Sequence, residues 1–221
     1  MSETLLSPKQ QVTASEQDDC FYHEMMAHPV LFTHRHPQKV AIIGNEAGIA
    51  AEVLKHATVQ AVTLVTASAH LPDCPEFTKS GDTRLTHYQG DAATWISQTA
   101  DESFDVIILT QPALASNYQR LLHKDGFLVQ PHQTTWLSQE NWQAFNQTMQ
   151  QAGFSEWQLF HFPQPGHPAG WRFAIMANKT KHFKRPREKD IFNRNFTTRY
   201  YNLDMHKSSL ALPEFIRSMI E

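Results

Sequence analysis

The stretch Lys39-Val-Ala-Ile-Ile-Gly-Asn-Glu-Ala-Gly-Ile-Ala-Ala-Glu-Val-Leu-Lys55 decides the fold of this chain. Its four consecutive apolar residues, Val40–Ile43, are too few for a helix and predict a strand buried on both faces. Gly44 interrupts the run, and apolar residues then recur at helical spacing, as at Ile49 and Val53. A buried strand, a glycine turn and a helix form the first part of a nucleotide-binding α/β unit, in which the turn backbone approaches the ligand closely.

The turn by itself leaves two interpretations open. Gly44 and Gly48 are its only glycines, so the GxGxxG fingerprint of dinucleotide-binding proteins is absent. An ordinary turn between a strand and a helix, in a sheet that binds nothing, fits this sequence as well as a nucleotide-binding turn does.

The composition indicates an ordinary globular protein. The chain has 221 residues, of which 41% are hydrophobic and 19% charged, and its net charge is −3. This length suits one well-buried domain, and this charge requires neither nucleic acid nor an anionic membrane as a partner. Cys20 and Cys74 have no paired spacing, and no N-terminal signal or apolar run of ~20 residues is present. We therefore expect a cytoplasmic protein that is not bound to a membrane.

Predicted strands and helices alternate along the rest of the chain. Short apolar runs predict further strands at residues 61–65, 85–89, 104–109, 127–129, 157–162 and 171–176. Helical patterns cover residues 20–28, 92–98, 112–122 and 138–151. This alternation indicates a mainly parallel sheet covered on both faces, and the last two strands, with no helix between them, place one antiparallel strand near an edge. The predicted fold class is α/β, of the methyltransferase-like Rossmann type.

The beginning of the chain is predicted to lie outside this domain. Residues 1–19 are polar and are interpreted as a mobile tail, so the α/β domain is expected to span residues 20–221. Asp18 or Asp19 is the expected N-cap of the first helix, and Pro29 is expected to kink or end it.

Polar residues follow four of the predicted strands. In open parallel sheets, ligands bind outside the carboxyl ends of the strands. The residues expected at this edge are Gly44-Asn-Glu46, Thr66-Ala-Ser68, Gly90-Asp91 and Thr110-Gln111. The sequence therefore predicts the ligand site there.

Two other clusters carry weaker functional interpretations. Four histidines near the N-terminus suggest a metal site, but no cysteine or carboxylate completes a ligand set, so no metal is predicted; they are His23, His28, His34 and His36. Residues 178–190 are rich in lysine and arginine but have few interleaved aromatic side chains. We interpret this stretch as a solvated connector and expect no nucleic-acid partner.

Two outer segments of the chain resemble motifs of the spermidine synthases. Tyr22-His-Glu-Met-Met-Ala-His28, followed by Lys39-Val-Ala-Ile-Ile-Gly44, resembles the YHEM…H…VLIIG segment of that family. The end of the chain resembles the RYYN…H…FALP ending of bacterial members, through Arg199-Tyr-Tyr-Asn202, His206 and Ala211-Leu-Pro213. Ser103–Ile108 and His167–Phe173 fall between them in the expected order, so the resemblance spans residues 20–221.

The resemblance implies an aminopropyltransferase on a methyltransferase-like fold. Such enzymes move the aminopropyl group of decarboxylated S-adenosylmethionine, which is a co-substrate, to a diamine, usually putrescine, and release methylthioadenosine. No cofactor is bound permanently, and a homodimer is the assembly that we expect. The reaction is displacement at carbon by an amine, so the site must hold one end of the diamine deprotonated and aligned.

The matched positions give the candidate cofactor-binding residues, which are Tyr22, His23, Gly44, Glu46, Thr66, Asp91, Ala92 and Thr110. The family turn GGGDG is one residue longer than the turn here. A gap inside the turn aligns Glu46 with the family Asp that holds the aminopropyl amine, whereas a later gap aligns Ala47 with it. Thr66 stands where the family has an acid for the ribose, and Asp91 matches the acid that reads adenine.

The catalytic positions depart most from the family. Thr110 and Gln111 follow the strand after which the family has an Asp proposed to deprotonate the amine, and the loop that follows is shorter here. Gln111 and His167 are the predicted catalytic residues. Gln111 would orient the amine, and His167, which replaces a substrate-contacting tyrosine, would serve as the base because histidine titrates near neutral pH.

Two functions of different classes therefore remain open. The first is a divergent aminopropyltransferase. The second is a catalytically inactive relative that acts as a binding or regulatory partner of an active subunit, because the family base, the ribose acid and most of the family's N-terminal β domain are missing. A methyltransferase that uses intact S-adenosylmethionine is a weaker third. The position of Glu46 discriminates, since a carboxylate pointing into the cleft preserves the donor site.

Overall fold

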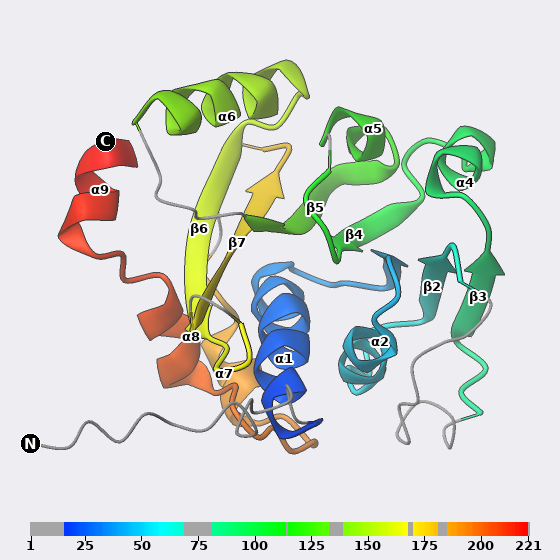
Figure 1. Cartoon of the computed structure of the whole chain (residues 1–221). Coiled ribbons are helices and arrows are strands. Elements are labelled where there is room, and N and C mark those ends of the chain that lie inside the picture. The colour runs from blue at the N-terminus through cyan, green and yellow to red at the C-terminus, as the bar shows by residue number, and fades with distance from the viewer. Residues whose placement is uncertain are drawn as a thin grey trace, which may run out of the picture.

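The computed structural model describes residues 16–68, 81–113, 115–132, 139–167, 170–180 and 185–220, and shows a seven-stranded sheet with helices on both faces (Figure 1). The strands are β1 (Lys39–Ile43), β2 (Ala61–Thr66), β3 (Leu85–Gln89), β4 (Phe104–Leu109), β5 (Leu122–His132), β6 (Glu156–Pro163) and β7 (Trp171–Asn178). The helices are α1 (Glu16–Thr33), α2 (Ala47–Leu54), α4 (Ala92–Gln98), α5 (Ser116–Gln119), α6 (Gln139–Gln151), α7 (Glu188–Phe192), α8 (Leu203–Ser209) and α9 (Glu214–Ile220).

The sheet has the strand order β3-β2-β1-β4-β5-β7-β6. The first five strands in this order pair in parallel, whereas β7 is antiparallel to both of its neighbours, β5 and β6. β7 follows β6 with no helix among the described residues of the connection, so the two strands pair as a hairpin and the direction reverses. This confirms the predicted α/β fold with one antiparallel strand near an edge.

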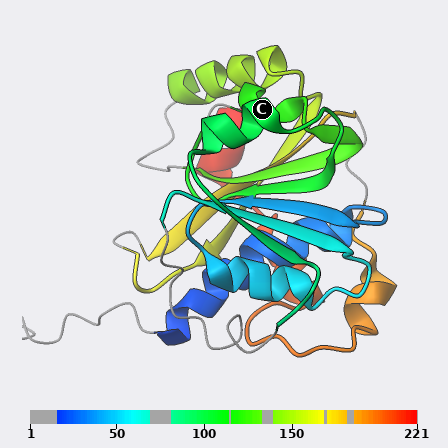
Figure 2. The same cartoon turned by 90° about the vertical axis from the view of Figure 1, so that its right-hand side faces the viewer.

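Two layers of helices bury the two faces of the sheet (Figure 2). Helices α1, α2 and α7 pack on one face, which includes Val40 and Ile42 of β1. Helices α4, α5, α6 and α9 pack on the other face, which includes Ala41 and Ile43. Alternate side chains of β1 therefore enter different cores, which explains why this strand is a continuous apolar run.

Helix α1 is longer than the sequence predicts. It begins by Glu16 and continues through Pro29 to Thr33, whose hydroxyl donates to the Pro29 carbonyl at 2.8 Å. Asp18 and Asp19 lie inside the helix, so the predicted N-cap is wrong, and the last four residues of the predicted tail are helical. Residues 1–15 lie outside the described residues. The helix continues past Pro29 because residues 24–34 are all buried, and such packing outweighs local helix propensity.

The connection between β4 and β5 also differs from the prediction. Only Ser116–Gln119 is α-helical within the predicted helix 112–122, and β5 begins at Leu122 rather than at residue 127. Leu121 and Leu122 are completely buried, and Leu122 pairs with Phe104 before the register shifts. Leu122 therefore belongs to the start of an irregular strand, whereas Tyr118 lies in the short helix α5. The predicted cap of α6 at Ser138 lies outside the described residues.

Glu24 ties α1 to the C-terminal segment. Its carboxylate is 1% exposed and accepts three hydrogen bonds, from the backbone N–H groups of Arg199 at 2.7 Å, Tyr200 at 2.9 Å and Tyr201 at 2.7 Å. Glu24 belongs to the first of the two outer sequence motifs and the three amides belong to the second. The two motifs therefore meet in space, and their contact is structural.

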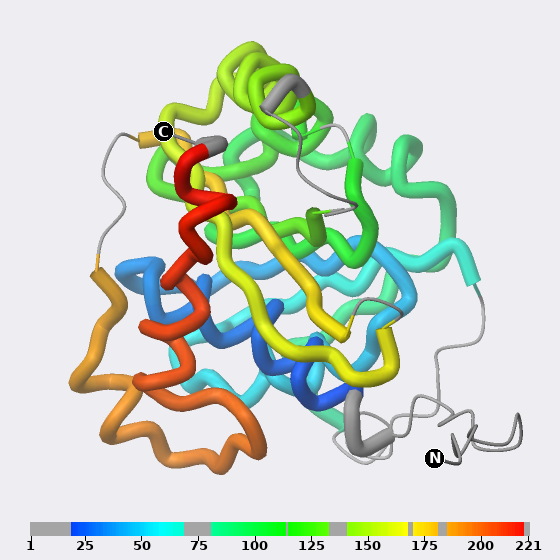
Figure 3. Tube along the Cα trace, turned by 60° about the vertical axis from the view of Figure 1, so that its left-hand side comes forward, coloured from blue at the N-terminus to red at the C-terminus, as the bar shows by residue number. Residues whose placement is uncertain are grey.

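The C-terminal segment crosses the edge of the sheet (Figure 3). Arg187 lies at the start of this segment and binds the end of α1. Its guanidinium donates to the carbonyls of Leu31 and His34, and its backbone N–H donates to the carbonyl of Phe32. Farther along, a ring nitrogen of His161 in β6 lies 2.8 Å from the Ala211 carbonyl. At least one residue of the basic stretch 178–190 is therefore a structural contact at the end of α1.

Three histidines are buried beneath this segment. His28 contacts His56 at 2.9 Å and Glu52 at 3.0 Å, and the Tyr201 hydroxyl lies 2.8 Å from Nδ1 of His206. Burial lowers the pKa of His28, His56 and His206, to about 4 for His206. Within the described ranges, no group of three or more His, Cys, Asp or Glu side chains is arranged to hold a metal ion. No helix among the described residues is both long and apolar enough to cross a bilayer.

Replacing Glu24 with Gln should destabilise the protein by about 2–4 kcal/mol, because an amide nitrogen then faces buried N–H donors that lose their acceptor. Urea unfolding followed by circular dichroism measures this change. The matched substitution Glu214→Gln, at an exposed residue of α9, should leave the midpoint unchanged. Equal midpoints for the two variants would contradict the structural role of Glu24.

The folded protein should lose stability as the pH falls from 6.5 towards 4. The pKa of His206 is about 4 in the fold, below its unfolded value near 6.5, so its contribution is complete above pH 6.5 and is lost below it. The loss from His206 alone reaches about 3 kcal/mol at pH 4. Unfolding free energies measured across this range should fall less steeply for His206→Asn, which does not titrate; parallel slopes would refute this assignment.

Candidate active site

A large cleft of about 840 Å³ lies at the carboxyl ends of the central strands. Tyr22 and Asp19 reach it from α1, Glu46 from the turn after β1, Thr110 and Gln111 from the end of β4, and His167 and Arg172 from the β6–β7 hairpin. These residues come from four separate parts of the chain, and the sheet brings them together at the edge where the sequence predicts a ligand.

A neighbouring cleft of about 430 Å³ continues along the same edge towards β2 and β3. Its lining includes Gly44, Ser68, Asp91, Ala92 and Tyr118. The two clefts share a wall made of Asn45, Thr110, Gln111 and Pro112. One elongated ligand, or two ligands that react with each other, therefore fits across Thr110.

Gly44 permits the close approach that forms this wall. Its φ is +129°, and a Cβ at this position would lie 1.8 Å from Oγ1 of Thr110. The backbone N–H of Thr110 donates to the Ile43 carbonyl at 3.0 Å, which fixes the end of β4 beside the turn. Only glycine fits here, because any side chain would occupy the place of the threonine hydroxyl.

Glu46 lines the large cleft. Its carboxylate lies 3.2 Å from Nε2 of His23, and its side chain is 38% exposed. Gly48 allows this contact, since a Cβ there would lie 2.1 Å from the His23 ring. Ala47, the alternative for this position, is buried as the first residue of α2 and has no polar side chain. Glu46 is therefore the residue of the turn that can hold a cationic group of a ligand.

Tyr22 forms a wall of the large cleft next to Thr110. Its hydroxyl donates to the Thr110 carbonyl at 3.1 Å, and the guanidinium of Arg172 lies over its ring at 5.0 Å. Burial, followed by the charge of Glu46, raises the pKa of Tyr22, so the hydroxyl stays protonated and keeps donating. Tyr22 thus connects α1 to the end of β4.

Two histidines face the large cleft in their neutral form. Burial lowers the pKa of His167, and the charge of Arg172 lowers it further; burial likewise lowers the pKa of His132. A neutral imidazole has a nitrogen that accepts a proton, so both are chemically suited to be a base. Gln111 lines the cleft with an exposed side chain that can donate or accept a hydrogen bond.

The sequence analysis missed His132 and Arg172. His132 is the last residue of β5, and a strand predicted to end at residue 129 did not extend to the carboxyl edge. Arg172 lies inside the His167–Phe173 segment that carried the resemblance. A charged residue at the beginning of an otherwise apolar strand was the available signal, but only the tertiary structure places it over Tyr22.

Asp91 and Tyr118 mark the far end of the neighbouring cleft. Asp91 caps α4 by accepting from the N–H of Thr94 at 2.9 Å and from its hydroxyl at 3.1 Å. Burial raises the pKa of Tyr118, and the Asp91 charge raises it further. Asp91 is exposed, and a carboxylate has more acceptor positions than this cap uses. It can therefore cap the helix and bind a ligand donor at the same time.

The structure does not place Thr66 in the lining of either cleft. The residue is 1% exposed; its hydroxyl donates to the Ser68 carbonyl at 2.8 Å and lies 2.8 Å from Nε2 of His87. The hydroxyl therefore donates its hydrogen inside the protein and has a second polar contact there. Ser68, two residues farther on, lines the neighbouring cleft instead.

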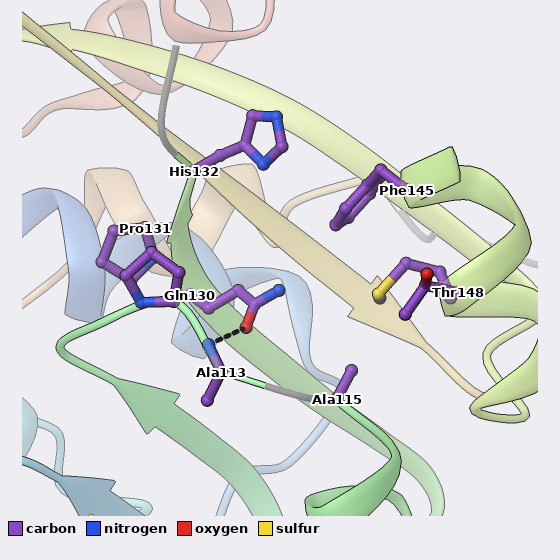
Figure 4. Close-up of a pocket in the computed structure, with 9 residues that line it drawn as sticks. Ala113, Ala115, Gln130, Pro131, His132, Phe145 and Thr148 are labelled. Carbon is purple, nitrogen blue, oxygen red and sulfur yellow. Dashed lines mark hydrogen bonds between the residues drawn. The ribbon is translucent and has the colours of Figure 1, made fainter. Parts of the chain in front are cut away.

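A smaller pocket of about 250 Å³ adjoins the large cleft between β5 and α6 (Figure 4). Figure 4 shows Phe145 and Thr148 facing Gln130 and His132 across it, and Gln130 accepts a hydrogen bond from the N–H of Ala113 at 3.3 Å. Pro112, Pro131 and His132 line both cavities. A ligand in the large cleft therefore has room for a short apolar extension.

Comparisons with known proteins agree with this architecture. Residues 19–186 match the family model described as the spermine/spermidine synthase domain. The chain is 36% identical to a polyamine aminopropyltransferase of Nitrosococcus oceani, and the alignment covers 95% of this chain and 80% of that protein.

Two solved structures share the fold. The spermidine synthase from Thermotoga maritima superimposes with a TM-score of 0.79 at 24% identity, covering 93% of this chain and 76% of that one. A spermidine synthase in complex with the transition state analogue AdoDATO gives a TM-score of 0.77 at 25% identity, with 93% and 75% coverage.

Proposed function

Because the chain belongs to the spermine/spermidine synthase family, we propose that it transfers an aminopropyl group from decarboxylated S-adenosylmethionine to a diamine such as putrescine. Methylthioadenosine is the second product. The observation that carries this proposal is the shared wall of the two clefts, which allows a nucleoside sulfonium on one side and an amine on the other to meet above Thr110.

The nucleoside part of the donor fits the neighbouring cleft. Asp91 lies where a carboxylate can accept from the adenine amino group, and Ser68 offers a hydroxyl near the end of β2 for the ribose. The aminopropyl chain passes the Gly44 turn into the large cleft, where the Glu46 carboxylate holds its ammonium group. Tyr22 and His23 close the wall beside it, and His23 positions Glu46.

The acceptor amine enters the large cleft. Gln111 orients the amine, and neutral His167 takes its proton. The nitrogen lone pair attacks the carbon next to sulfur, the carbon–sulfur bond breaks, and its electron pair neutralises the sulfonium to a thioether. Alignment of the two substrates supplies most of the acceleration, because no covalent intermediate is needed. The homodimer and the cytoplasmic location predicted from the sequence stay predictions.

Calorimetric titration of the purified chain should show that it binds both decarboxylated S-adenosylmethionine and methylthioadenosine. The Glu46→Gln variant should bind decarboxylated S-adenosylmethionine about tenfold or more weakly, because a charge-assisted hydrogen bond to the ammonium is lost. Its affinity for methylthioadenosine should not change, since that product has no aminopropyl group.

Glu214→Gln is the matched control and should bind both ligands like the wild type. If a well-folded wild-type chain binds neither nucleoside, the transfer proposal fails and the inactive relative becomes the better description. An equal weakening of both ligands by Glu46→Gln would refute the assigned role of Glu46.

The pH profile of transfer tests the base. The pKa of His167 lies below its usual 6.5, so this residue is unprotonated at neutral pH and kcat should fall only as the pH drops below 6.5. His167→Asn should lower kcat by about a hundredfold and remove this acidic limb. A variant that keeps both wild-type kcat and the limb would show that another group, with His132 as the next candidate, takes the proton.

A further inference from the structure

Arg172 is a cation in the cleft proposed to bind an amine. In the described part of the chain its Nε donates to Oε1 of Gln164 at 2.6 Å, its guanidinium stacks over Tyr22 at 5.0 Å, and its two terminal nitrogens have no hydrogen-bond partner. No carboxylate among the described residues lies within ion-pair distance of it. An arginine whose charge the protein does not neutralise at the site needs an explanation.

The contacts with Gln164 and with the Tyr22 ring hold the guanidinium but leave its two terminal nitrogens available. Stacking on Tyr22 occupies one face of the plane, and Gln164 occupies Nε. The remaining terminal N–H groups form the fork that matches a carboxylate in a bidentate pair. Because Tyr22 is itself fixed by its bond to the Thr110 carbonyl, this fork is positioned relative to the reaction centre.

A simple alkyl diamine leaves the charge of Arg172 without an anionic partner. Such a diamine carries two ammonium groups before transfer, and Arg172 repels both. Of the acidic residues that line the cleft, Glu46 serves the donor and Asp19 is left for one acceptor ammonium. Among the described residues that line the cleft, Arg172 is therefore a cation with no carboxylate at ion-pair distance.

We propose that a substrate bound in the large cleft carries a carboxylate and that Arg172 binds it as a specificity-determining residue. This inference rests on the proposed transfer reaction. The arrangement suits a diamino acid as acceptor: Arg172 takes the carboxylate, Asp19 the α-ammonium, and the terminal amine reaches Gln111 and His167. A carboxylate retained on the donor, as in intact S-adenosylmethionine, is the other source of the same chemistry.

The reaction balances with either source. His167 takes the proton of the acceptor's terminal ammonium, the freed amine attacks the carbon next to the sulfonium, and the carbon–sulfur bond breaks with its electron pair going to sulfur. The carboxylate takes no part in bond making, so it contributes only to binding and orientation. Its removal should therefore raise KM more than it lowers kcat.

Ornithine and putrescine provide the decisive comparison, because they differ only by the carboxylate. Calorimetric titration in the presence of methylthioadenosine should show ornithine binding about tenfold or more tightly than putrescine. Arg172→Gln should remove this preference, and Arg172→Met, which keeps apolar contact with Tyr22, should do the same. Arg35→Gln, on the exposed turn before β1 at the opposite edge of the sheet, is the matched control and should keep the preference.

Titration of intact and decarboxylated S-adenosylmethionine distinguishes the two sources. If the wild type binds intact S-adenosylmethionine more tightly than the decarboxylated form, and Arg172→Gln removes this difference, the carboxylate belongs to the donor. Equal or tighter binding of putrescine together with no Arg172-dependent preference between the two donors overturns the proposal. If neither nucleoside donor nor methylthioadenosine binds, the transfer proposal fails. The titration with ornithine is a separate measurement, and its dependence on Arg172 still decides whether this residue binds a carboxylate.

Discussion

The close approach of the β1 turn to the end of β4 is the constraint on which the site depends. Gly44 has no side chain, so the Thr110 hydroxyl occupies the space where a Cβ would stand. That contact makes the wall between the two clefts thin enough to be shared. A larger residue at this position would push the ends of β1 and β4 apart. The arrangement of the two clefts therefore depends on the absence of a side chain at the carboxyl end of β1.

The second constraint is the attachment of α1. This helix carries Tyr22 to the large cleft and His23 to Glu46, while Glu24, the next residue, binds three backbone amides of the C-terminal segment. The Tyr22-His-Glu-Met motif therefore combines two roles in adjacent residues. Its first two side chains face the ligand edge, and its third fixes the helix to the opposite end of the chain. Arg187 and the buried histidines complete the same packing.

Electrostatics in the cleft follow from burial. Partial burial lowers the pKa of His167 and of His132, because the protein solvates their charged form less well than water does. A charged arginine beside them strengthens this effect for His167. The same arginine places a positive charge in the cleft beside Tyr22.

The sequence alone determined the order of the strands and the edge of the sheet at which the two clefts lie. Those features depend on local patterns, such as the apolar run of β1, the glycine after it and the polar residues at strand ends. The tertiary structure decided which side chains reach the clefts. Thr66 turns its hydroxyl inward to Ser68 and His87, whereas Arg172 comes from a distant hairpin to lie over Tyr22. The tertiary structure likewise has α1 continue past Pro29 and β5 continue to His132, beyond the ends that the sequence predicts. Such outcomes depend on contacts between residues far apart in the chain, which no local pattern records.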